Sequence, residues 1–130
     1  MNALKELADA INAMPDMPQK VSVGFLSADE TLSIYPTKNG SVIDEDFAGN
    51  QETRLYYEVA IRTIDQQLGN AIMWSVSDFV KHLKELPSDD FRFETIETTS
   101  EPSITQADSR GFFVYTLDVA LNVTSNKYKE

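Results

Sequence analysis

The chain has 130 residues, of which 42% are hydrophobic, and 21 acidic against 11 basic side chains give it a formal net charge of −10. This length predicts one domain, spanning residues 1–130, with a single core that buries about two-thirds of the unfolded surface. An acidic surface repels phosphate backbones and releases no counterions from DNA, so ordinary nucleic-acid binding is excluded.

The chain contains no cysteine, which excludes disulfides and thiolate metal sites and fits a reducing compartment. No apolar run approaches the ~18 residues that a membrane span needs. Residues 1–6 lack a basic patch followed by an apolar core, so we expect no secretory signal and no membrane partner.

The first third of the chain predicts short elements. Residues 2–14 place apolar side chains on one helical face, with Asn2 as the cap and Pro15 beyond the end. Residues 21–26 and 31–35 read as two strands joined in a hairpin by an acidic link. Pro36 is expected to end the second strand, because proline cannot donate to a ladder.

A polar loop is predicted for residues 38–52. It is long for a compact domain, and such loops are often functional. Apolar side chains stand among carboxylates in it, which indicates a surface that another chain covers; alternatively, they pack back on their own core. The residues concerned are Val42, Ile43, Asp44, Glu45, Asp46 and Phe47.

The central stretch predicts a long strand that runs directly into a long helix. Residues 53–63 alternate between apolar and polar positions, and Asp65 can cap the helix that follows. We expect about six helical turns, ended by Pro87. Trp74 and Met73 lie on a flank away from the predicted core stripe, so Trp74 is covered by the N-terminal helix or marks a partner site. The stripe consists of Leu68, Ile72, Val76, Phe79, Leu83 and Leu86.

The last third predicts two further strands. Residues 91–97 form one, residues 98–110 a polar loop, and residues 111–123 a central strand with a continuous apolar face, followed by a flexible tail at residues 124–130. The predicted fold is α+β: a single mixed or antiparallel sheet of about five strands, packed by a long central helix and a short N-terminal helix.

Residues for catalysis or metal binding are nearly absent. His82 is the only histidine, and with no cysteine it cannot complete a metal site or a thiol dyad. Asp89 and Asp90 are better explained as turn residues than as paired catalytic carboxylates. The acids of the 38–52 loop lack the register of a calcium loop, and the glycines are isolated. We expect no enzyme, no metal and no cofactor.

The order of the predicted elements and several short stretches within them form a distinctive pattern. Residues 56–63 pass straight into Asp65-Gln66-Gln67-Leu68, and the helix leads to Phe91-Arg92-Phe93 and a closing strand at residues 111–119. This pattern, over about residues 1–125, is similar to the minor capsid and tail terminator proteins of tailed phages that infect Gram-positive bacteria. The 38–52 loop has no counterpart in the pattern.

The resemblance implies a structural virion protein of the tail or neck, assembled in the host cytoplasm. Such terminators form a ring, usually a hexamer, that caps the tail tube, stops its growth and joins the tail to the head connector. DNA passes through the ring without sequence-specific binding. The partners implied are further copies of the chain, the tail tube protein and connector proteins. Candidate interface residues are Val42, Ile43, Asp44, Glu45, Asp46, Phe47, Trp74, Ile104, Asp108 and Arg110.

Three alternatives remain open beside the structural role, and an enzyme has the least support because no nucleophile, base or metal set is visible. An acidic inhibitor or DNA mimic would bind a basic host or phage partner, although the acids are interleaved with Lys and Arg. A small-molecule-binding domain would need a concave sheet lined by aromatic side chains, which are more simply explained as core. These aromatics are Tyr57, Phe93, Phe113 and Tyr115.

Overall fold

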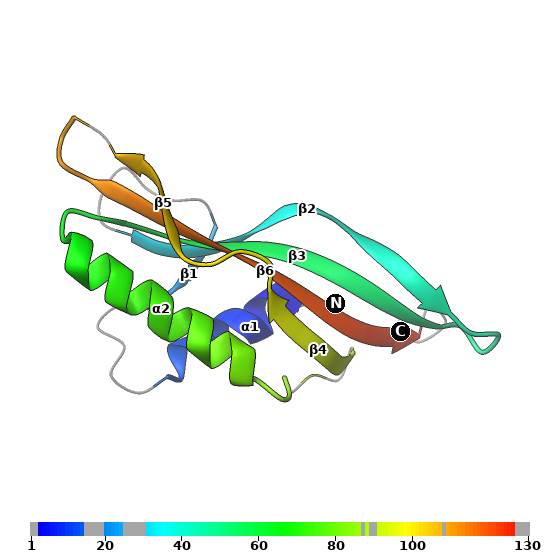
Figure 1. Ribbon diagram of the computed structural model, residues 1–130. Helices are drawn as coiled ribbons and strands as arrows, with labels where there is room; N and C mark the ends of the chain where they lie inside the picture. The colour runs from blue at the N-terminus through cyan, green and yellow to red at the C-terminus, as the bar shows by residue number, and fades with distance from the viewer. Residues whose placement is uncertain are drawn as a thin grey trace.

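Three long antiparallel strands form the centre of the fold in the computed structural model (Figure 1), which describes residues 3–14, 20–24, 31–86, 88, 91–107 and 109–126. The six-stranded sheet has the order β1-β2-β3-β6-β4, and β5 also pairs with β6. The elements are α1 Ala3–Asn12, β1 Ser22–Val23, β2 Thr31–Glu45, β3 Asn50–Thr63, α2 Gln66–His82, β4 Arg92–Thr98, β5 Ser103–Ala107 and β6 Phe113–Asn126.

One face of the sheet carries the hydrophobic core. Ile34 pairs with Val59, and Val59 pairs with Leu117, so the three side chains lie in one row across β2, β3 and β6. Because side chains alternate along a strand, the residues two positions away extend the same apolar face. Both helices lie against this face (Figure 1), and the three residues of the row are almost fully buried.

Helix α2 begins where the sequence predicts it and ends earlier. The Asp65 carboxylate accepts a hydrogen bond of 3.0 Å from the Leu68 amide, which caps the first turn. The helix ends at His82, so the expected continuation to Leu86 is wrong. The buried face is also rotated from the predicted stripe: Leu68 is exposed and Phe79 half-buried. The buried residues are Gly69, Ile72, Met73, Val76, Ser77 and Val80.

Helix α1 supplies the rest of the cover. Leu7 and Ile11 are fully buried, and the Asn12 side chain ties the helix to the next segment. Its amide nitrogen donates to the Val21 carbonyl at 3.1 Å, and its oxygen accepts from the Val21 amide at 2.7 Å. This anchor places β1 beside β2 in parallel register, so the predicted antiparallel hairpin between these strands is wrong.

The predicted α+β fold, with about five strands and a long central helix, is contradicted because the sheet dominates the molecule. Two predicted loops contain strand. β2 continues through Pro36 to Glu45, where residues 38–52 were expected to form a loop, and β5 lies within the expected 98–110 loop. Pro36 is tolerated because its strand pairs there with β3 on one side and the ladder shifts register just after it.

The other face of the sheet is polar and lies away from both helices (Figure 1). Glu58 and Asp118 are direct cross-strand partners on this face, and the Tyr35 hydroxyl donates to Glu58. Partial burial, together with a hydrogen bond to Asp118, raises the pKa of Glu58 above its usual value of 4.5. A negative charge on Glu58 is therefore disfavoured at the middle of the sheet.

Candidate functional site

The far end of the sheet is an extension of β2 and β3 that we call the distal hairpin, residues 42–53. Val42 pairs with Thr53, and Asp44 pairs with Glu52, across an antiparallel ladder. Figure 1 shows this hairpin projecting past the helices and past β4. Only β6 accompanies it, reaching Asn50 with its last residue. The segment predicted as a loop is thus an ordered arm.

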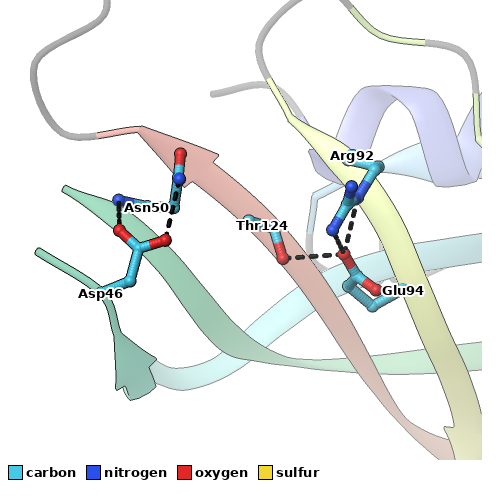
Figure 2. A network of polar contacts seen from close by, with 5 residues as sticks. All are labelled: Asp46, Asn50, Arg92, Glu94 and Thr124. Carbon is cyan, nitrogen blue, oxygen red and sulfur yellow. Dashed lines mark hydrogen bonds and ion pairs between the residues drawn. The ribbon is translucent and has the colours of Figure 1, made fainter. Parts of the chain in front are cut away.

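The turn of the distal hairpin is fixed by Asp46 (Figure 2). Its carboxylate accepts hydrogen bonds from the amides of Ala48 at 2.9 Å and Asn50 at 3.0 Å, and from the Asn50 side chain at 2.9 Å. The Asn50 side chain and these amides hold the pKa of Asp46 below its ordinary value. Gly49 has a φ of 86°, a conformation that glycine adopts without strain. The turn therefore presents residue 47 in a defined position.

Apolar side chains on the distal hairpin face solvent. Phe47 is fully exposed at the tip, and Val42 and Ile43 are 51% and 50% exposed. They do not pack back on the core, so that alternative is wrong for these three residues. Residues 42–53 also include acids and no lysine or arginine. The hairpin combines protruding apolar groups with several acidic side chains.

Polar contacts hold β4 against β6 at the base of the distal hairpin. The Glu94 carboxylate accepts from the Thr124 hydroxyl at 2.8 Å and lies 2.8 Å from the Arg92 guanidinium (Figure 2). The Thr124 hydroxyl, followed by Arg92, lowers the pKa of Glu94. Arg54 pairs with Glu97 across the same region. These hydrogen bonds and ion pairs therefore stabilise the part of the sheet from which the distal hairpin projects.

The opposite end of the sheet presents a second exposed area around β5. All five residues of β5 are exposed, including Ile104. In the turn that follows, the Arg110 guanidinium lies 4.8 Å from the centre of the Phe112 ring. A surface hollow of about 430 Å³ lies beside these residues, and we call it the β5 hollow. It is lined by Arg62, Thr105, Gln106, Ala107, Phe112 and Val114.

The candidate interface residues fall into three places. The residues from Val42 to Phe47 lie together on the distal hairpin, while Ile104 and Arg110 lie together at the opposite end. Trp74 is 41% exposed on the outer side of α2, apart from both groups. Asp108 lies outside the described residues. Local sequence patterns do not predict where these residues lie in space, because pairing between distant strands decides their positions.

Sequence reasoning missed Ile64 and Phe112 as candidates for a contact surface. Ile64 is exposed in the turn between β3 and α2. Phe112 is half-buried beside Arg110 and lines the β5 hollow. One signal was available: both are apolar residues next to a turn, at the same end of two neighbouring antiparallel strands.

The described residues offer little for catalysis. Within the part of the chain that the structure describes, no group of three or more His, Cys, Asp or Glu side chains is placed to hold a metal ion. No described helix is both long and apolar enough to cross a membrane. The carboxyl pair Glu58 and Asp118 lies on an open sheet face with no described histidine or cysteine beside it.

A braced sheet with an exposed apolar arm and an exposed strand at its other end is typical of a structural protein that works by assembly. The comparison with protein families agrees with this class: the family model described as bacteriophage tail terminator protein matches residues 3–125. The chain belongs to the bacteriophage tail terminator family. A comparison with curated proteins found no match.

Membership in this family indicates a structural role in the phage tail. It also implies contacts with other tail components and a location in the virion tail.

Proposed function

We propose that the chain assembles into a ring, most simply a hexamer, that caps the tail tube, stops its growth and joins the tail to the head connector. The observation that carries the proposal is the distal hairpin, with Phe47 fully exposed and Val42 and Ile43 half exposed on an arm that the helices leave uncovered. Exposed apolar groups on a rigid arm are suited to contact with other protein chains.

The geometry also suits a ring. The distal hairpin and β5 occupy opposite ends of one long sheet, so a contact between unlike ends joins copies head to tail. Such a heterologous contact, repeated about an axis, closes a ring. Assembly in the host cytoplasm and a place at the neck of the virion follow from this role, with the tail tube protein and connector proteins as neighbours.

The negative net charge is expected to make ring formation depend on salt concentration. Six copies of a chain with formal net charge −10 carry −60, which repels DNA passing through the centre and opposes assembly. Salt screens this repulsion over about 8–10 Å at ordinary ionic strength. Ring formation is therefore expected to strengthen between low and moderate salt.

Light scattering across concentration and salt, followed by negative-stain images with purified tail tubes, tests the proposal. The expected results are a mass corresponding to a ring, or particles seated at the tube ends. A strict monomer that ignores tubes under all conditions would contradict it. The acidic-inhibitor alternative is less well supported, because two of the carboxylates beside the distal hairpin, Glu97 and Glu94, are paired with Arg54 and Arg92.

A further inference from the structure

We propose that Asp46 is a positioning residue for assembly: its carboxylate orders the turn of the distal hairpin, so that Phe47 is held ready for a partner that Asp46 itself does not touch. This inference rests on the proposed function, in which the hairpin tip contacts another component of the tail. It adds to the tip a second residue, whose role is to fix the backbone that carries Phe47.

The position of Phe47 does not depend on packing against the body of the protein. Phe47 is fully exposed, and it lies in the turn between β2, which ends at Glu45, and β3, which begins at Asn50. If this turn were not ordered beforehand, it would have to become ordered on binding. Ordering the backbone of one residue lowers a binding constant roughly tenfold, so a turn fixed in advance avoids that loss.

Hydrogen bonds from Asp46 span the whole turn. Its Oδ1 accepts from the backbone amides of Ala48 at 2.9 Å and Asn50 at 3.0 Å, and its Oδ2 accepts from the Asn50 side chain at 2.9 Å (Figure 2). The main chain closes the same loop, because the Asp46 amide donates to the Asn50 carbonyl at 3.0 Å and the Gly49 amide donates to the Asp46 carbonyl at 3.2 Å. The three residues that follow Phe47 are therefore all hydrogen-bonded to Asp46.

The carboxylate of Asp46 is directed toward Asn50 across the turn (Figure 2). Both of its oxygens accept hydrogen bonds from within the hairpin, and the same contacts, with the Asn50 side chain first, lower its pKa. An aspartate that accepts an amide two residues ahead is a common way to fix a turn. This arrangement indicates a role within the hairpin rather than a carboxylate presented to a partner.

Two other acids of the arm make contacts of a different kind. Asp44 accepts from the amide of its own neighbour, Glu45, at 3.0 Å. Glu45 accepts from the Gln51 side chain at 3.2 Å, which joins β2 to β3. Neither contact involves Phe47, Ala48 or Gly49, so neither orders the turn as Asp46 does.

Attraction of a basic partner by the negative charge of Asp46 is the competing explanation. Positioning requires an acceptor oxygen at Oδ1, whereas attraction requires the charge. Asp46→Asn separates the two, because asparagine keeps an oxygen that accepts from both backbone amides and carries no charge. The Asn50 side chain can turn over so that its own oxygen accepts from the new amide group, which preserves the third hydrogen bond.

Hydrogen exchange of the free chain tests the ordering of the turn. Asp46→Ala is expected to speed exchange of the Ala48 and Asn50 amides, and Asp46→Asn is expected to keep it close to that of the natural chain. The melting temperature should stay nearly unchanged in both variants, because Asp46 is exposed and lies far from the core. Unchanged exchange in Asp46→Ala would overturn the inference.

Binding to purified tail tubes, measured by the concentration at which half of the tube ends are capped, tests the role in assembly. Asp46→Ala is expected to raise that concentration about tenfold. Asp46→Asn and the matched control Glu52→Ala, which removes a carboxylate of the same arm outside the turn, should cap like the natural chain. Natural capping by Asp46→Ala would overturn the inference, as would a loss in Asp46→Asn or Glu52→Ala equal to that in Asp46→Ala.

The same experiment separates this inference from the proposed function. Tubes that are capped equally by the natural chain and by Asp46→Ala overturn the positioning role and leave the terminator function intact. A natural chain that forms no rings and binds no tubes overturns both.

Discussion

The covered body of the sheet and the distal hairpin are built from the same three strands, but apolar side chains are buried in the body and exposed on the hairpin. In the body, Ile34, Val59 and Leu117 are almost fully buried beneath the helices. On the hairpin, Val42, Ile43 and Phe47 face solvent. Buried apolar area stabilises the fold, whereas exposed apolar area on an ordered arm is available to another chain.

The boundary between the covered body and the distal hairpin lies where β4 stops pairing with β6. β4 pairs with β6 only as far as Arg92, opposite Thr124, while β2, β3 and β6 continue beyond it. One continuous strand can thus serve stability at one end and assembly at the other. The predictions below separate these two roles, from the largest expected effect on stability to the smallest.

The largest effect is expected in the covered body. Leu117 is fully buried in the central strand, and Leu117→Ala removes its packing and leaves a cavity. We expect a loss of about 2–5 kcal/mol in the free energy of unfolding. Urea denaturation followed by circular dichroism measures it. An unchanged midpoint would show that the sheet face under the helices is not the core.

The junction of α2 with the sheet is expected to be the next most sensitive. A Cβ at Gly69 would lie 2.7 Å from Cγ2 of Thr63 and 3.2 Å from the Tyr115 ring. Overpacking of this kind costs about 1–3 kcal/mol, against about 1 kcal/mol gained from helix propensity. Gly69→Ala should lower the melting temperature, and Asn70→Ala, at the exposed neighbouring position, should not.

The polar face of the body is expected to respond to pH. Because the pKa of Glu58 is raised in the folded state, its proton stabilises the fold below about pH 4.5, and this contribution is lost as pH rises through the folded pKa. Glu58→Gln keeps a neutral group that accepts from Tyr35 and donates to Asp118. We expect the variant to melt higher than the natural chain near pH 7, with the difference shrinking toward pH 4.

Glu94 provides a control of opposite sign. Its folded pKa is lowered, so its charge stabilises the fold above about pH 4.5, and that contribution is lost as pH falls through the folded pKa. Glu94→Gln should therefore melt lower than the natural chain near pH 7. Melting curves in which both glutamine variants shift in the same direction would refute the assignment of the Glu58 carboxyl pair.

The smallest effect on stability is expected at the tip of the hairpin. Phe47 is fully exposed, so Phe47→Ala should change the free energy of unfolding by less than about 0.5 kcal/mol. The same substitution should abolish capping of tail tubes in negative-stain images. A large fall in melting temperature would place Phe47 in the fold rather than in the interface.

The sequence predicted the body of this fold better than its ends. Alternation along residues 53–63 and 113–123 and the cap at Asp65 depend on local chemistry, and the structure confirms all three. Pro36, Asn39 and Gly40 are typical of turns, so the sequence predicted a loop where the structure has the continuation of β2. Shifts in the register between β2 and β3 accommodate these residues. The sequence did not predict β5, because its residues are exposed on both faces and show no alternation of apolar and polar side chains.

The candidate site was predicted only in part, for a related reason. The unusual composition of residues 42–47 was visible along the chain, yet their exposure depends on where β4 and the helices stop. The grouping of Arg62, Arg110 and Phe112 depends on pairing between β3, β5 and β6. Such contacts join residues distant in sequence, and local periodicity carries no information about them.

Hydrogen exchange of the free chain and of the chain bound to tail tubes tests the central claim most directly. In the free chain, amides of the covered body should exchange slowly and those near the hairpin tip faster, because local opening costs less there. On binding, the account predicts new protection concentrated in residues 42–53. Protection confined to the body, with the hairpin unchanged, would contradict the claim that the distal hairpin is the assembly surface.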